Sequence, residues 1–214
     1  MREFRRRPFG HQYSCRYRHS GTYQVVNENS LGINGMVLNK SLVTPNGVYI
    51  PYTDYLHSGE LWFTDCTTTG TILLKDIFAG GYPNHSFPDY LTYLNGNIFF
   101  TARSDSFDYE LWTTENTAAT TQLVKDIMPG KMGSLPEALT VFNNKIFFSA
   151  TDSSGRELWF SDGTDSGTQL LMDIYPGQSS AITNYSKFAV FNNELYFPAR
   201  NGVSGTELWK TNGT

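Results

Sequence analysis

The sequence predicts an all-β fold, a β-propeller built of four-stranded antiparallel blades. The first observation is a stretch that recurs four times, with the glutamates of its Glu-Leu-Trp core 50, 47 and 50 residues apart, at Glu60, Glu110, Glu157 and Glu207. Self-similarity at a period of this length indicates a repeat architecture. The second observation is composition: 15% of the 214 residues are aromatic and only 17% are charged, which is typical of many short strands joined by tight turns.

The third copy shows the expected order of strands. Residues 138–142 and 145–150 are apolar and flank Asn143-Asn144, whose tolerance of left-handed backbone suits a tight hairpin. A strand at 156–161 follows, and Asp162-Gly163-Thr164 opens a turn to a last strand at 168–174. Each copy therefore predicts a meander of four short strands.

The third observation is that these strands are apolar on both faces. In the strand at 156–161, Leu158 and Phe160 point to one side and Trp159 to the other. Both faces of each sheet must be covered, and the sequence offers no helical segment to cover them. Sheets that stack face to face on identical neighbours meet this need, which favours a propeller over a linear β-solenoid, whose rungs are usually shorter.

We expect one repeat domain over residues 21–214, preceded by a basic leader over residues 1–20. The blade units fall at 21–40 (partial), 41–77, 91–127, 138–174 and 187–214. The leader carries six arginines and one glutamate, which predicts a disordered segment, with a basic binding arm as the alternative. The rest of the chain has 10 basic and 19 acidic side chains, which argues against nucleic acid as a partner, and no apolar run is long enough for a membrane span.

Two closures of the array fit the sequence. Residues 21–27 (GTYQVVN) match the fourth strands at 70–76 and 167–173, whereas the last unit reaches only its third strand. The N-terminal strand would thus complete the last blade and clasp a four-bladed ring. Alternatively, these units belong to a larger array, with neighbouring repeats of a longer chain as partners.

The repeat resembles the ELWxxDGT repeat family of large bacterial secreted or cell-surface proteins. Residues 157–177 (ELWFSDGTDSGTQLLMDIYPG) carry the whole motif, and the resemblance covers residues 21–214. The turn departs from the motif at 64–67, 114–117 and 211–214, and Asn27 replaces the aspartate found in the other copies. The resemblance implies a propeller-like fold and an extracellular or cell-surface location, and it implies no established activity.

The repeated residues are expected to be structural. The four glutamates should accept hydrogen bonds or pair with arginines, and the tryptophans should pack between blades. Aspartates before the blade exits should anchor the loops. The set comprises Glu60, Trp62, Asp76, Glu110, Trp112, Asp126, Glu157, Trp159, Asp173, Glu207 and Trp209.

The Asp-Gly turns suggest calcium as a cofactor, and its ligands would be Asp162 and Asp165. Two acids and a few hydroxyls fall short of a calcium loop, and the other copies lose one or both acids, so we expect no metal here. The two cysteines, Cys15 and Cys66, lack metal-like spacing and are expected to be unpaired thiols.

Binding residues are expected where the copies differ from one another. The loop between the second and third strands and the connection between blades should open on one face, opposite the regular Asn-Asn and Asp-Gly turns. Variable loops on a rigid scaffold are the usual home of binding residues. The candidates on this face are Tyr55, His57, Arg103, Asp105, Asp108, Tyr109 and Arg200.

The function we expect is a non-enzymatic extracellular module that acts as a scaffold or binds a protein or glycan ligand. No serine-histidine-aspartate set, metalloprotease helix or facing pair of carboxylates stands out, and the four histidines are scattered. A propeller enzyme that acts on polysaccharide is the alternative, with catalytic groups around the central channel. A calcium-stabilised structural propeller is the third possibility.

Overall fold

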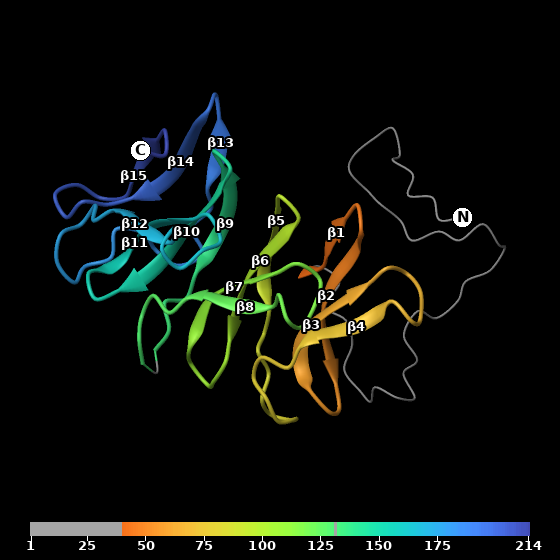
Figure 1. Cartoon of the computed structure of the whole chain (residues 1–214). Helices are drawn as coiled ribbons and strands as arrows, with labels where there is room; N and C mark the ends of the chain where they lie inside the picture. The colour runs from red at the N-terminus through yellow and green to blue at the C-terminus, as the bar shows by residue number, and fades with distance from the viewer. Residues whose placement is uncertain (1–39, 131) are drawn as a thin grey trace.

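A computed structural model describes residues 40–130 and 132–214. These residues form fifteen strands in four antiparallel sheets and contain no α-helix (Figure 1). The expected leader at 1–20 and most of the partial unit at 21–40 lie outside the described residues. The all-β fold class is confirmed.

The four sheets follow one another along the chain, and in each the strands pair in sequence order. The first sheet holds β1 (Leu42–Thr44), β2 (Gly47–Asp54), β3 (Ser58–Thr64) and β4 (Thr71–Lys75). The second holds β5 (Asp89–Leu94), β6 (Asn97–Arg103), β7 (Tyr109–Thr114) and β8 (Gln122–Lys125). The third holds β9 (Glu137–Phe142), β10 (Lys145–Asp152), β11 (Gly155–Ser161) and β12 (Gln169–Met172). The fourth holds β13 (Ala189–Phe191), β14 (Glu194–Ala199) and β15 (Glu207–Thr211).

The first hairpin of the later sheets turns on asparagine, as predicted. Asn143 and Asn144 both have positive φ, 47° and 59°, between β9 and β10, and Asn192 and Asn193 repeat this between β13 and β14 with φ of 48° and 58°. Two consecutive residues in the left-handed region match the twist of the flanking strands. The turn thereby sets which residues of the two strands face each other.

Three apolar layers hold the sheets together, and Figure 1 shows the four sheets following one another in chain order. In β10, Phe148 packs in the layer shared with the second sheet, whereas its neighbour Phe147 packs in the layer shared with the fourth. In β11, Trp159 and Leu158 divide in the same way. The prediction that both faces of the sheets are covered is therefore confirmed for the inner sheets, and each layer joins one face of a sheet to the opposite face of the next.

The expectation of an unpaired thiol is wrong for Cys66. Its sulfur is disulfide-bonded, and the residue is buried with a positive φ of 70° in the turn after β3. Cys15 lies outside the described residues. The spacing of two distant cysteines in a sequence carries no information on whether the fold brings their sulfurs together.

Truncating a buried ring in a sheet-to-sheet layer should destabilise the fold far more than truncating an exposed one. Phe148 is 0% exposed in the layer between the second and third sheets, whereas Phe107 is 67% exposed in a loop. We expect Phe148→Ala to lower the free energy of unfolding by about 3–5 kcal/mol. Phe107→Ala should change it by less than about 0.5 kcal/mol. Urea unfolding measures both, and equal losses would contradict the layered packing.

Candidate functional site

The glutamates of the Glu-Leu-Trp motif tie each sheet to the connection that leads to the next. Glu110 in β7 accepts hydrogen bonds from the backbone N–H groups of Met128 and Ser134, at 3.2 and 2.8 Å, and from the Ser134 hydroxyl at 2.5 Å. Glu157 in β11 accepts from the N–H groups of Ile174 and Ala181, both at 3.0 Å. These carboxylates satisfy backbone groups in the buried connections.

The first copy of the motif follows this pattern, and the last copy does not. Glu60 in β3 accepts from the N–H of Phe78 at 3.2 Å and the hydroxyl of Ser86 at 2.6 Å. Glu207 in β15 is exposed, since no fourth strand or connection covers it among the described residues. Burial of the carboxylate thus follows from the connection that wraps over it.

Burial shifts the titration of these glutamates. It raises the pKa of Glu60, Glu110 and Glu157 from 4.5 to about 7 in each case, and the hydrogen bonds that the carboxylates accept oppose the rise only in part. The charges of Asp76 and Asp173 add to the rise of pKa at Glu60 and Glu157. These groups therefore titrate near neutral pH.

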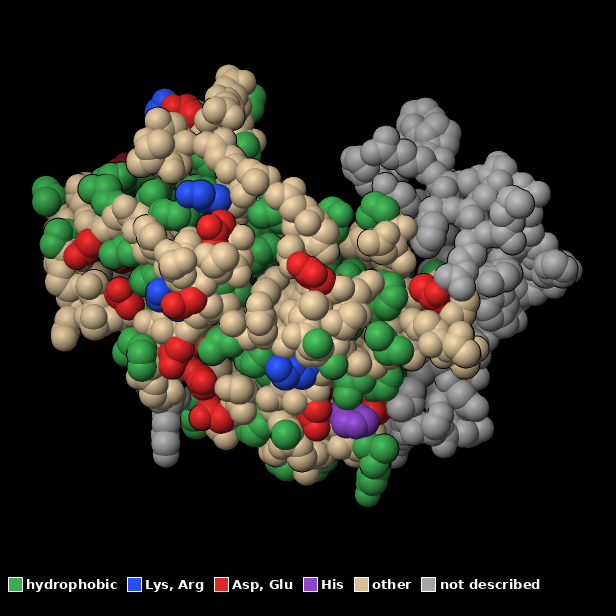
Figure 2. Space-filling view, viewed as in Figure 1, with side chains coloured by type: hydrophobic (Ala, Val, Ile, Leu, Met, Phe, Trp, Pro, Cys, Tyr) green, Lys and Arg blue, Asp and Glu red, His purple; other side chains and the backbone are tan. Residues whose placement is uncertain are grey.

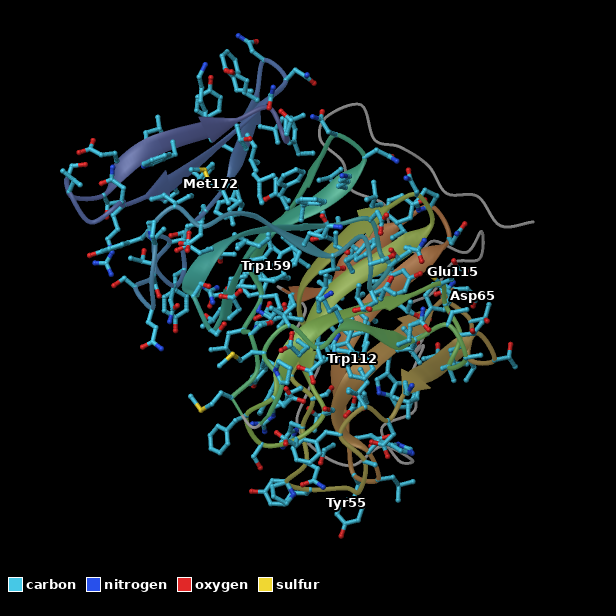
Figure 3. The ribbon with its side chains drawn as sticks, turned by 60° about the vertical axis from the view of Figure 1, so that its left-hand side comes forward. Tyr55, Asp65, Trp112, Glu115, Trp159 and Met172 are labelled. Carbon is cyan, nitrogen blue, oxygen red and sulfur yellow. The ribbon has the colours of Figure 1, made fainter. Side chains whose placement is uncertain are left out.

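The tryptophans of the motif lie at the sheet-to-sheet layers. Trp112, Trp159 and Trp209 pack in the first, second and third layers in turn. Figure 3 shows Trp112 and Trp159 in the interior between the ribbons. Trp62 is half-buried and lies edge-on to Tyr52, with ring centroids 5.7 Å apart.

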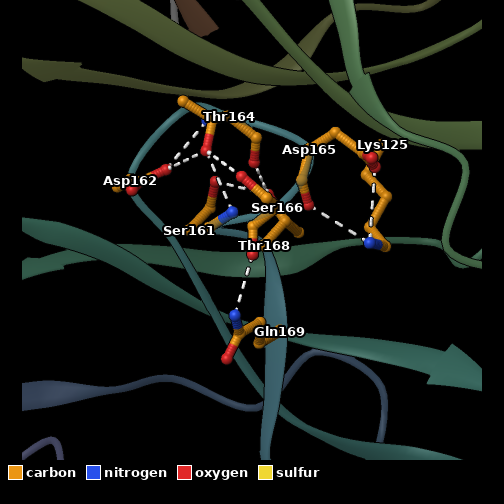
Figure 4. A network of polar contacts seen from close by, with 9 residues as sticks. Lys125, Ser161, Asp162, Thr164, Asp165, Ser166, Thr168 and Gln169 are labelled. Carbon is orange, nitrogen blue, oxygen red and sulfur yellow. Dashed lines mark hydrogen bonds and ion pairs between the residues drawn. The ribbon is translucent and has the colours of Figure 1, made fainter.

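The Asp-Gly-Thr turn after β11 is closed by its own side chains (Figure 4). Asp162 Oδ1 accepts from the N–H of Thr164 at 2.9 Å and from its hydroxyl at 2.7 Å, and these bonds lower the pKa of Asp162. The hydroxyl of Thr164 accepts from the N–H of Gly167 at 2.9 Å. Asp165 pairs with Lys125 of the second sheet at 3.3 Å. Both acids are thus engaged in turn and inter-sheet contacts.

Another set of carboxylates comes closer to a cation-binding arrangement. Asp108, Glu110 and Asp126 place oxygens within 4.8 Å of one another, although both oxygens of Glu110 also accept hydrogen bonds.

The expected anchoring role of the exit aspartates is not visible in the described residues. One buried oxygen of Asp76 and one of Asp173 have no hydrogen-bond partner there.

Arg103, the last residue of β6, contacts the connection that leads into its own sheet. Its Nε donates to the carbonyl of His85 at 2.7 Å, and its guanidinium lies 4.7 Å from the ring of Phe87 and 5.6 Å from that of Tyr109. Arg200 makes the corresponding bond in the fourth sheet, from Nε to the carbonyl of Ser180 at 2.9 Å. Each arginine therefore ties the connection that enters its sheet to the end of the second strand of that sheet.

The other candidates on this face lie in two separate loops, Tyr55 and His57 between β2 and β3, and Asp105 and Asp108 between β6 and β7. Tyr55 is exposed at the tip of the loop between β2 and β3, far from the interior tryptophans (Figure 3). His57 contacts Asp54 through Nδ1 at 2.7 Å. Asp105 accepts from the N–H of Asp108 at 3.0 Å within the loop between β6 and β7. Burial raises the pKa of Asp108, and the negative charges of Asp105 and Asp126 raise it further. A hydrogen bond from the side chain of Ser104 opposes this rise.

Of the candidate residues, only Tyr109 lines the pocket on this face. The pocket has a volume of about 300 Å³ and lies where the first strands of the sheets begin. Its walls come from the second and third sheets, from Lys40 just before the first sheet and from the connection that precedes the fourth. The lining residues are Lys40, Phe87, Asp89, Tyr90, Thr101, Tyr109, Leu135, Pro136, Glu137 and Tyr185.

Two carboxylates in the pocket are held by cations. Asp89 forms an ion pair with Lys40, and Glu137 pairs with the buried Arg156 at 3.0 Å. Glu137 also accepts from the N–H of Tyr185 at 2.8 Å. Burial raises the pKa of Tyr90, and the negative charge of Glu137 raises it further. The Tyr90 phenol therefore keeps its proton and remains a hydrogen-bond donor at neutral pH.

Sequence reasoning missed most of this pocket. Phe87, Tyr90 and Tyr185 have φ of 47°, 55° and 63°, a region that bulky side chains rarely adopt. Ala138 takes the place of Tyr90 in the next sheet with φ of 60°, so this backbone is a recurring feature of the connections. The aromatic residues at these positions are specific to their copy, and their variation between copies was the signal available in the sequence.

The chain matches no family model and no curated protein in sequence comparisons. Among the described residues, no helix is long and apolar enough to cross a membrane. Figure 2 shows carboxylates scattered over the visible face, with few basic groups between them.

The buried glutamates should make stability depend on pH. Their pKa is raised above the ordinary value of 4.5, so the folded state holds protons that the unfolded chain has released. This stabilisation is complete below about pH 4.5 and is lost as the pH rises through about 7. We expect the melting temperature to fall between pH 5 and 8, and to fall less in Glu110→Gln. A pH dependence equal in the two proteins would contradict this.

The same substitution at Glu157 should have a different effect. In Glu110→Gln, the new amide group can donate to the Ser134 hydroxyl. At Glu157 both oxygens accept from backbone N–H groups, so a glutamine places its amide against one of them. We expect Glu157→Gln to lose about 1–3 kcal/mol of folding free energy at pH 5, and Glu110→Gln to lose less than 1 kcal/mol. Denaturant unfolding at pH 5 compares the two variants directly.

Proposed function

We propose that this chain is a non-enzymatic extracellular β-propeller module of the ELWxxDGT type that binds a glycan at the pocket of its variable-loop face. The stacking of four antiparallel sheets in chain order supports the blade architecture. The first strands of the second and third sheets and the segments that lead into the first and the fourth share one pocket, which is the arrangement expected around a central axis. The long repeated motif supports the family and its extracellular location.

The chemistry of the residues that line the pocket supports a sugar as the ligand. Phe87, Tyr90, Tyr109 and Tyr185 contribute aromatic surface to the pocket, and Asp89 and Glu137 contribute carboxylate oxygens. Rings supply apolar contact area at low cost in side-chain entropy, and carboxylates accept hydrogen bonds from hydroxyl groups. A ligand with alternating C–H surfaces and hydroxyl groups, such as a sugar ring, satisfies both. The volume of about 300 Å³ suits one or two sugar units.

The charges in the pocket favour binding over catalysis. Glycoside hydrolysis needs one carboxyl group that carries a proton beside one that does not. Here both Asp89 and Glu137 are paired with cations, so neither carboxyl group is available to a substrate as a catalytic group while its ion pair is closed. The alternative of a polysaccharide-acting enzyme needs one of these pairs to open when substrate binds.

Tyr185 provides the sharpest test, because its ring is 82% exposed and its removal leaves the core intact. We expect the protein to bind a subset of neutral oligosaccharides on a glycan array. Tyr185→Ala should weaken the binding about tenfold by calorimetry, the loss expected for one stacking ring.

Tyr82 supplies the matched control. It is also a tyrosine, 83% exposed on the same face, and it does not line the pocket. Tyr82→Ala should bind as the unchanged protein does. Equal losses in the two variants, or no sugar bound at all, would contradict the proposal. Release of reducing ends from a bound polysaccharide would instead favour the enzyme.

A further inference from the structure

A second cavity adjoins the pocket on the variable-loop face. Its volume is also about 300 Å³, and Lys40, Asp89 and Tyr90 line both cavities. The residues that line only the second cavity lie just before β1, in β5 and in β9: Ser41, Leu91, Thr92 and Leu139. Because Leu91 and Thr92 follow Tyr90 directly in β5, the second cavity continues the pocket along this strand.

The second cavity offers hydrogen-bonding groups that the protein does not use itself. The hydroxyl oxygen of Ser41 is buried and has no hydrogen-bond partner among the described residues. Within the same part of the chain, β5 pairs with β6 alone, so no strand occupies the backbone groups of its other edge. Backbone groups and hydroxyls are the polar contacts that commonly orient a small ligand in a cavity. The second cavity therefore suits a ligand rich in hydroxyl groups.

The ion pair between Lys40 and Asp89 lies at the junction, since both residues line both cavities. Its two side chains are partly exposed. A sugar hydroxyl can accept a hydrogen bond from the ammonium group and donate one to a remaining lone pair of the carboxylate, so it can bind beside the closed ion pair. An acidic sugar would instead compete with Asp89 for Lys40. The junction thus favours a neutral chain of sugars.

We infer that the second cavity is a further sugar-binding subsite, which lets the protein hold a longer neutral oligosaccharide than the pocket alone accommodates. The inference rests on the proposed function, because the second cavity extends the same pocket. The aromatic side chains of the pocket contact the C–H faces of the first units, and the junction and the second cavity bind the hydroxyl groups of the next. Two cavities of about 300 Å³ each suit about two to four units together.

Calorimetry with fragments of different lengths tests the subsite. The probe is the neutral glycan with the strongest signal on the array, cut by partial acid hydrolysis and separated by length. We expect the affinity to rise about tenfold or more between fragments of about two and about four units, and to rise little beyond that length.

Ser41→Tyr should remove this dependence on length, because the larger side chain fills the second cavity. Ser41 does not line the pocket, so the two-unit fragment should bind Ser41→Tyr as it binds the unchanged protein. Ser204→Tyr is the matched control, since Ser204 is exposed in the loop between β14 and β15 and lines neither cavity. This control should keep the full dependence on length.

Hydrogen exchange gives a readout that needs no variant. The four-unit fragment should slow exchange at the amides of Leu91 and Thr92, because it covers the second cavity. The two-unit fragment, bound in the pocket, should leave these two amides unchanged. This measurement decides the question if Ser41→Tyr does not fold or loses the two-unit fragment as well.

The outcomes separate this inference from the proposed function. Equal affinity for the two-unit and four-unit fragments would overturn the subsite and leave the sugar-binding pocket standing. A dependence on length that Ser41→Tyr retains, or exchange at Leu91 and Thr92 that the four-unit fragment does not slow, would also overturn the subsite alone. Failure of every fragment to bind would contradict the proposed function, and the subsite with it.

Discussion

The buried carboxylate of the Glu-Leu-Trp motif is the contact on which the arrangement of the sheets depends. It lies at the start of the third strand, and its hydrogen bonds go to the N–H groups of the connection that leaves the fourth strand. A connection of irregular backbone would otherwise bury polar groups without partners. Because one side chain satisfies two or three of these groups, the connection can pass tightly over the sheet. That close passage brings the next sheet into contact with the apolar face of the one before.

The fold was accessible from the sequence because its determinants are local and repeated. Asn143-Asn144 specifies a hairpin through its own backbone preference, and the alternation of Leu158 and Trp159 shows that both faces of the strand are covered. Each of these signals occurs several times in the chain, so a chance match at one position is corrected by the others. Any contact between the first and last sheets would join distant repeats, and no local pattern encodes such a contact.

The candidate site was less accessible for a related reason. Arg103 and Arg200 look like ligand contacts in the sequence, yet their side chains donate to the carbonyls of His85 and Ser180. Whether an arginine is used internally depends on which carbonyl the fold brings beside it. Conversely, Phe87 and Tyr185 lie in connections with little similarity between copies, and only the three-dimensional arrangement gathers them with Asp89 of β5 in one pocket.

The closing of the turns by hydroxyl groups has a consequence for how such chains diverge. Asp162 and Asn212 accept the same pair of bonds, from the N–H and the hydroxyl of the threonine two residues later. An acid and an amide are therefore interchangeable at this position, since the geometry needs one oxygen and no charge. Successive copies can gain or lose a negative charge at the rim without altering the shape of the turn. Exchanges of aspartate and asparagine at these turns can therefore change the surface charge of the protein while the backbone of the turns stays the same.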